Sequence, residues 1–171
     1  MSGFERYLAI ESAGGPSWHT EKREIAFTFN APGTYQIFSV EIMRGHPLWP
    51  RRLSYEKDRC TAPKYLSDGS LIFMKDDGGD ENFQIGCIKE DGELMWLTSN
   101  PSVKHIIDIV TDSGFFFNAN IEDRSRRDPY RLKNPVDQNE PELIHRSEEG
   151  VMRVDCASQD EKQLILERFL G

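Results

Sequence analysis

The 171-residue chain contains little cysteine and no spacing typical of a metal site. Its cysteines are Cys60, Cys87 and Cys156, and no two of them form a Cys-x-x-Cys pair. Because a disulfide framework or a zinc knuckle needs such pairs, we predict free thiols that are buried or half-buried. The four histidines also lack the one-turn spacing of zinc motifs. We therefore expect no bound metal and no cofactor.

The chain also lacks a long apolar run and an excess of positive charge. No stretch of about 18 apolar residues occurs, and the amino terminus shows no basic segment followed by an apolar core. The sequence thus predicts no membrane span and no signal peptide, and we expect a cytoplasmic protein. Lys and Arg number 21 against 29 Asp and Glu, which gives a net charge of -8. Since duplex nucleic-acid binders normally carry a basic footprint, no nucleic-acid partner is expected.

The chain does contain an internal repeat. Four segments each combine a short strand-like stretch, a polar turn and an apolar triplet, and the triplets end at Phe27, Phe73, Phe117 and Leu166. The steps between these residues are 46, 44 and 49. A period of this size indicates a repeat architecture whose loops vary in length.

Two further alignments extend each unit. Third strands are predicted where an aromatic, a polar and an aliphatic residue recur, starting at Tyr35, Phe83 and Tyr130. Fourth strands are predicted around recurring leucines, at Leu53, Leu97 and Leu143. The steps are 48 and 47 for the third strands and 44 and 46 for the fourth.

Four short strands per unit are typical of a β-propeller blade, whereas leucine-rich, ankyrin and tetratricopeptide repeats are shorter and mostly helical. The apolar segments are rich in Phe, Ile, Val and Tyr and are bounded by Asp-Gly, Gly-Gly and Asn-Pro turns, as strands are. We predict one all-β domain over residues 1–171, a partial β-propeller of about three complete four-stranded antiparallel blades plus half of a fourth. The predicted blades span about 14–55, 61–99 and 105–146, and the half blade spans 151–170.

Turns and packing positions follow from the repeat. Ser67-Asp68-Gly69-Ser70 predicts a hairpin turn between strands at 62–66 and 70–75, because these residues tolerate positive φ. Asp112-Ser113-Gly114 has the same role in the third unit. Trp18, Tyr65 and the Phe115–Phe117 cluster occupy strand positions that are predicted to pack between blades.

The second unit resembles a known family. Pro63-Lys64-Tyr65-Leu66-Ser67-Asp68-Gly69, followed by Leu71-Ile72-Phe73, is similar to the blade motif of TolB-like and prolyl-oligopeptidase-type propellers. Asp76-Asp77-Gly78-Gly79-Asp80-Glu81-Asn82-Phe83-Gln84-Ile85, with 92–98 and 101–105, resembles the second blade of acylaminoacyl-peptidase or dipeptidyl-peptidase-like members of the prolyl oligopeptidase family of serine peptidases. Residues 49–54 resemble the end of that family's first blade.

The resemblance implies a lid rather than a catalytic unit. In that family a propeller of seven or eight blades covers a carboxy-terminal α/β-hydrolase domain that carries the catalytic Ser, Asp and His. The likeness runs from about Phe4 to the last residue, so it covers only the amino-terminal part of such a protein. No serine lies in a Gly-x-Ser-x-Gly elbow, and no catalytic residue is assigned. The expected partners are the hydrolase domain and, as substrates of the parent enzyme, peptides.

The fourth unit stops after two of its four strands, at Gly171. Three and a half blades would leave unpaired strand edges. We therefore expect a fragment, a truncated reading frame or a degenerate relative that either rearranges or covers its open blade edges by self-association.

Asp80, Glu81 and Asn82 are the candidate substrate-binding residues. On this hypothesis, adjacent carboxylates at a strand start face the central cavity and capture a peptide amino terminus by charge. The alternative, which the residue types favour, is that they cap the turn at Gly78-Gly79 through bonds to the backbone.

The segment from Glu122 to Asp128 mixes charges of both signs. We interpret it as a solvated turn, in preference to an acidic-substrate site built on Arg126 and Arg127.

Two functions from different classes stay open. The first is a non-catalytic, substrate-gating propeller of a cytoplasmic serine peptidase whose triad lies outside these residues. The second is a stand-alone TolB-like scaffold that binds a protein partner through its loops or an open strand edge. The second-unit motif favours the first, and the missing Gly-x-Ser-x-Gly favours the second if the chain is complete.

Overall fold

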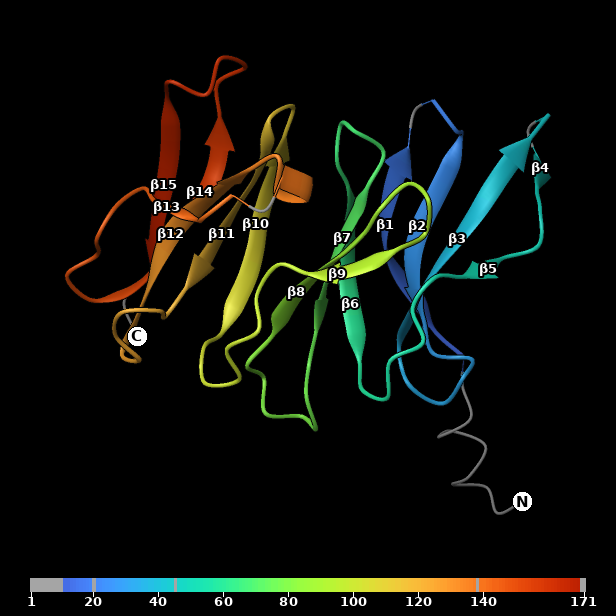
Figure 1. Cartoon of the computed structure of the whole chain (residues 1–171), viewed down its shortest axis with the longest axis horizontal. Helices are drawn as coiled ribbons and strands as arrows, with labels where there is room; N and C mark the ends of the chain where they lie inside the picture. Colours follow the sequence, from blue (N-terminus) through green and yellow to red (C-terminus); the bar gives the residue numbers. More distant parts are fainter. Residues whose placement is uncertain (1–10, 20, 45, 138, 170–171) are drawn as a thin grey trace.

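A computed structural model describes residues 11–19, 21–44, 46–137 and 139–169. These residues form fifteen β-strands and one single-turn 3₁₀ helix, η1 (Pro135–Asp137). Figure 1 shows how the strands are arranged. The predicted all-β class is confirmed. Within the described ranges, no helix has the length and apolarity needed to cross a membrane.

The first sheet has five strands in the order β1-β2-β3-β4, with β5 also paired to β3. The strands are β1 (Ala13–His19), β2 (Glu24–Phe29), β3 (Gln36–Met43), β4 (His46–Pro47) and β5 (Arg51–Arg52). All pairs are antiparallel. Two short pieces pair with β3 where one fourth strand was predicted. Pro50 lies between them and has no N–H to donate to a ladder.

The second sheet is an antiparallel meander of four strands, β6-β7-β8-β9. The strands are β6 (Cys60–Tyr65), β7 (Leu71–Lys75), β8 (Gln84–Ile88) and β9 (Leu94–Trp96). This unit therefore has the strand number and the simple connectivity that the repeat predicts.

The third sheet has six strands in the order β10-β11-β12-β14-β15, with β13 paired to β12. The strands are β10 (His105–Thr111), β11 (Gly114–Ala119), β12 (Arg126–Lys133), β13 (Glu142–Leu143), β14 (Gly150–Ala157) and β15 (Leu164–Phe169). The β14–β15 hairpin was predicted as a half blade. It joins the third sheet because Gly150 and Val151 pair in parallel with Arg126 and Arg127. The exact residue boundaries of the blades stay a prediction.

The first hairpin of every unit carries the same irregularity. Its register shifts between residues 14 and 17, 61 and 64, 107 and 109, and 154 and 156. Such a β-bulge bends the strand and increases its twist. Pro16 and Pro63 occupy the bulge in the first two units, where no ladder N–H is needed, and Asp108 and Asp155 occupy it in the other two.

Both predicted hairpin turns are present. Gly69 has a φ of 83°, and Oδ1 of Asp68 accepts a hydrogen bond from the N–H of Ser70 at 2.9 Å. Gly114 has a φ of 150°, and a Cβ there would lie 2.1 Å from the carbonyl oxygen of Leu132. Glycine is therefore required at the second turn by both its conformation and its surroundings.

The hydrophobic core lies between neighbouring sheets. A cluster of six buried residues joins the first and second sheets: Ala26, Ile37, Cys60, Leu71, Phe73 and Ile88. A larger cluster joins the second and third sheets and includes Met74, Ile85, Phe115, Phe117, Tyr130 and Leu132. The predicted packing between blades is confirmed for Phe115 and Phe117, which belong to this larger cluster, and Phe116 is also only 1% exposed. Trp18 was predicted to pack between blades, but its side chain is 48% exposed.

The backbone register corrects the alignment of the third strands. Phe27 pairs with Phe38, Phe73 with Gly86, and Phe117 with Tyr130. Tyr130 is therefore equivalent to Phe38 and Gly86, and not to Tyr35 and Phe83. The predicted alignment was wrong because the aromatic, polar and aliphatic order also occurs at Tyr130-Arg131-Leu132, three residues after the positions that are equivalent to residues 35–37.

Arg127 is the true equivalent of Tyr35 and Phe83. The next unit begins beside each of these residues. Cys60 N–H donates to the Tyr35 carbonyl at 2.8 Å, and His105 N–H donates to the Phe83 carbonyl at 3.1 Å. Val151 pairs with Arg127 at the same place in the third unit.

Candidate functional site

The predicted residues Asp80, Glu81 and Asn82 lie in the loop between β7 and β8. Oδ1 of Asp80 accepts the Asn82 backbone N–H at 2.9 Å, and its Oδ2 accepts the Asn82 side-chain amide at 3.2 Å. These bonds, the backbone one first, lower the pKa of Asp80. Asn82 is thus the partner of Asp80 within the turn.

Glu81 is held from two sides. Its φ is 60°, its N–H donates to Oδ1 of the buried Asp76 at 3.2 Å, and its carboxylate pairs with Lys104 at 3.1 Å. Asp76 also pairs with Arg59 at 3.2 Å. The geometry agrees with capping of the turn, and capture of a peptide amino terminus by Asp80, Glu81 and Asn82 stays a prediction.

The charged segment 122–128 is bonded more tightly than a solvated turn. Arg126 pairs with Glu122, Asp123 and Asp128 at 3.3, 3.7 and 3.1 Å. Asp128 is 1% exposed, and its Oδ1 accepts the N–H of Ser147 at 2.7 Å. Arg126 is therefore neutralised by neighbouring acids, whereas Arg127 takes part in none of these pairs.

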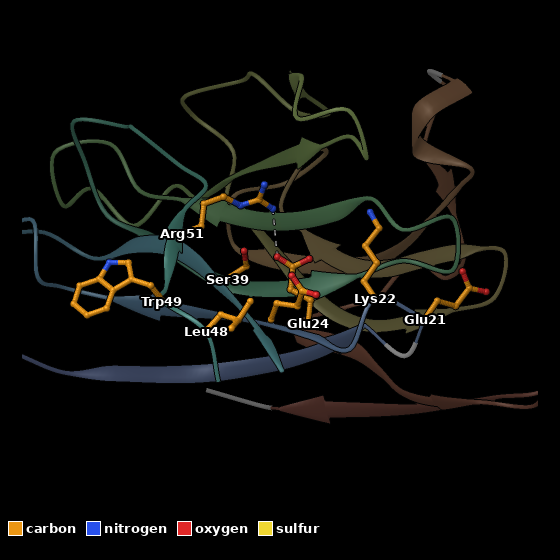
Figure 2. Close-up of a pocket in the computed structure, with 8 residues that line it drawn as sticks. Glu21, Lys22, Glu24, Ser39, Leu48, Trp49 and Arg51 are labelled. Atoms are coloured by element: carbon orange, nitrogen blue, oxygen red, sulfur yellow. Dashed lines mark hydrogen bonds and ion pairs between the residues drawn. The ribbon is translucent and has the colours of Figure 1, made fainter. Parts of the chain in front are cut away.

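A hollow with a volume of about 630 Å³ lies on the first sheet. It is lined from the β1–β2 turn, from β2 and β3, and from the segment that leads into β5: Glu21, Lys22, Glu24, Ser39, Glu41, Leu48, Trp49 and Arg51. Figure 2 shows the Arg51 side chain reaching toward Glu24, and the two groups are 3.4 Å apart. We call this hollow the β3 groove.

The sheet register brings the charged residues of the β3 groove together. Glu24 pairs with Glu41, and Ser39 pairs with Arg51, so these side chains share one face of the sheet. The hydroxyl of Ser39 is buried without a hydrogen-bond partner among the described residues, while Trp49 is 92% exposed. The groove thus offers carboxylates, cations and an exposed indole to a polar or peptide-like ligand.

The β3 groove continues toward the second sheet. A smaller adjoining hollow shares Lys22, Glu24 and Arg51 and is also lined by Tyr65. Burial, followed by the Glu24 carboxylate, raises the pKa of Tyr65. Lys22 pairs at 2.9 Å with Glu90, which lies in the turn between β8 and β9 of the second sheet. The sequence did not point to this groove, because its residues come from separate strands and only the register aligns them.

The cysteines are free, as predicted, but their exposure differs. Cys60 and Cys87 are buried, and burial raises the pKa of the Cys60 thiol to about 11. Cys156 is exposed, which corrects the prediction of a buried or half-buried thiol, because it follows the bulge on the outer hairpin β14–β15. Within the described ranges, no group of three or more His, Cys, Asp or Glu residues is arranged to hold a metal ion.

No protein-family model and no curated protein matches the chain. Solved structures do match. TolB from Acinetobacter baumannii superposes with a TM-score of 0.62 and 15% identity over 91% of this chain and 37% of that one. Dipeptidyl peptidase 4 from Porphyromonas gingivalis gives 0.60 and 16%, over 84% of this chain and 21% of that one. A puromycin-hydrolyzing peptidase from Mycobacterium tuberculosis gives 0.57 and 15%, over 80% and 21%.

These likenesses show the fold. The chain has the fold of TolB-like β-propellers, which is also found in peptidases of the prolyl oligopeptidase type, and the predicted propeller architecture is confirmed. The chain spans between 21% and 37% of the length of these three proteins. It therefore corresponds to a portion of each of them.

Proposed function

We propose that the chain is a non-catalytic propeller segment that controls the access of peptides to a serine hydrolase domain of the prolyl oligopeptidase type. The observation that carries the proposal is the superposition of over four-fifths of this chain on 21% of a dipeptidyl peptidase. The second-unit motif at residues 76–85 supports the same family.

The hydrolase domain is the partner in this proposal and supplies the nucleophile, base and orienting acid. Peptides are the substrates of the whole enzyme, and this portion selects them by size and by polar contacts. Asp80, Glu81 and Asn82 are the proposed anchor for a peptide amino terminus.

The size of the native protein tests the proposal. An antibody against residues 76–105 is used on a denaturing separation of source-cell extract, and a fluorophosphonate probe is run on the same separation. We expect one species several times heavier than 19.7 kDa that also carries the probe. A species of 19.7 kDa that the probe does not label would overturn the proposal.

The second candidate is a TolB-like scaffold that binds a protein partner or a second copy of itself. A specific feature favours it. Phe27, Phe29 and Phe38 contact one another on the face of the first sheet opposite to Ala26 and Ile37, with ring centroids 5.4 to 6.3 Å apart. A light-scattering mass above that of one chain, lowered by Phe38→Ser, would support this candidate.

A further inference from the structure

A second cavity lies where the β14–β15 hairpin meets the third sheet. Its volume is about 410 Å³, within the range of small-molecule sites. Residues of β10, β11, β12, β14 and β15 line it. Asp108, Asn118 and Arg127 are polar side chains that these strands bring to its wall.

The repeat shows that these three residues depart from the pattern of the earlier units. Arg127 occupies the position of Tyr35 and Phe83, as the strand register requires. Asp108 occupies the bulge position of Pro16 and Pro63. Asn118 follows Phe117 as Thr28 follows Phe27 and Met74 follows Phe73. We call the contact between one unit and the next a junction, so that the third junction lies between the third unit and the β14–β15 hairpin. The third junction therefore has two charged groups at positions where the first two junctions have uncharged residues.

Arg127 is a cation in the wall of this cavity. Its side chain is half-buried, and it takes part in none of the hydrogen bonds or ion pairs found among the described residues. Burial lowers its pKa, and the Asp108 carboxylate is the charge that opposes this effect. A half-buried guanidinium that makes no other hydrogen bond binds a carboxylate well, because its planar donors form two parallel hydrogen bonds with the two carboxylate oxygens.

Asn118 supplies an acceptor beside it. The side chain is 2% exposed, and its Nδ2 donates to Oδ1 of Asp108 at 2.6 Å. Its Oδ1 is buried and has no partner in the described part of the chain. Oδ2 of Asp108 accepts the Val154 N–H at 3.0 Å, so both oxygens of Asp108 are already engaged.

We propose that this cavity binds a small carboxylate that carries an adjacent amide N–H, such as an acylated amino acid or the carboxyl end of a peptide. Arg127 binds the carboxylate, and Oδ1 of Asn118 accepts the amide N–H after a small displacement of its side chain. Ile106, Val151 and Phe169 line the same cavity and contact the apolar part of the ligand. The site stands whether or not the chain belongs to a peptidase, since it uses only residues described above.

The test is an NMR titration of the ¹⁵N-labelled 171-residue chain with N-acetyl-leucine. The signals followed are the Arg127 Nε–H and the Asn118 side-chain amide, and N-acetyl-leucinamide is the matched ligand without a carboxylate. We expect both signals to shift with a dissociation constant on the order of 1 mM, as suits a ligand of this size. Equal shifts with the acid and the amide, or no shift of these signals, would overturn the proposal.

Two variants and one control make the result specific. Arg127→Gln is expected to weaken binding at least tenfold, and Arg146→Gln, an exposed arginine that pairs with Glu122, is expected to leave it unchanged. Asn118→Thr restores the residue of the first unit and is expected to weaken binding severalfold. If Arg127→Gln loses the spectrum of the native fold, the Asn118→Thr variant is the one that tests the assignment. Unchanged binding in a folded Arg127→Gln or Asn118→Thr chain contradicts the assignment.

The pH dependence gives an independent readout. Arg127, Arg153 and Asp155 are the charged side chains that share the cavity with Asp108, whose pKa is about 6. A bound anion favours the protonated form of Asp108, so affinity should rise as the pH falls, up to about eightfold between about pH 7 and 5.5. Asp108→Asn should remove this rise. Affinity that does not change over this range counts against an anion at this site.

Discussion

Asp108→Asn should change how the stability of the chain depends on pH. Burial raises the pKa of Asp108 from 3.8 to about 6, although the Val154 N–H, the Asn118 amide and the two arginines oppose this rise. The folded chain therefore binds a proton more tightly than the unfolded chain. The stabilisation from this group is complete below about pH 4 and is lost as the pH rises through about 6.

The magnitude follows from the two pKa values. Between about pH 4.5 and 7 the linkage amounts to a loss of about 2 kcal/mol in the free energy of unfolding. In a chain of this length, this corresponds to about 4 to 8 °C in the melting temperature. In the Asp108→Asn variant, the amide oxygen of the new side chain accepts the Val154 N–H, and its NH₂ group donates to Oδ1 of Asn118 once the Asn118 amide has turned over. The variant therefore keeps the fold while it loses the titration.

Paired thermal melts check this prediction. Wild type and Asp108→Asn are melted at half-unit steps from about pH 4.5 to 7.5, and the difference between the two curves isolates Asp108 from the other acids. As the pH rises from about 4.5 to about 7, we expect the free energy of unfolding of the variant to increase by about 2 kcal/mol relative to that of the wild type. Parallel curves would show that Asp108 is ionised at an ordinary pKa and would refute the reasoning.

Three further substitutions test the packing and the grooves. Gly114→Ala should destabilise the chain by about 3 kcal/mol in urea melts, because the new Cβ meets the Leu132 carbonyl and the φ of 150° is strained. Phe117→Ala should cost about 3 to 5 kcal/mol in the same assay, since Phe117 is 1% exposed between two sheets, and a cost below about 1 kcal/mol would contradict that packing. Trp49→Ala should change stability by less than about 0.5 kcal/mol, because the indole is 92% exposed, and a large loss would place Trp49 in a packed site.

The sequence predicts the fold well because the repeat depends on buried aromatic residues. Phe73 and Phe117 recur at nearly equal steps, and each packs toward the preceding sheet. Alternation along the strands then assigns one side to the core. The hairpin turns are also predictable, since Gly69 and Gly114 both have positive φ.

The register of the third strands was not predictable to the residue. The aromatic, polar and aliphatic order of Tyr35-Gln36-Ile37 recurs at Tyr130-Arg131-Leu132, three residues after the equivalent positions, and only the backbone pairing shows this shift. This offset concealed Arg127 as an equivalent of two aromatic residues. The β3 groove was missed for a related reason. Residues such as Ser39 and Arg51 are separated along the sequence and become neighbours only when their strands pair.

The three junctions between units are held by different interactions, which explains where a binding site can form. The first two bury clusters of aromatic and aliphatic side chains, and a charge inside such a cluster would lose hydration without a partner. The third, beside the β14–β15 hairpin, buries Val154 and also has charged side chains in its interface. Glu161 in the β14–β15 turn contacts Arg131, and Ser113 donates to its Oε1 at 2.8 Å. Because these contacts fix the hairpin at one end, the other end of the junction keeps a cavity for Arg127 and Asn118 that a fully apolar interface would close.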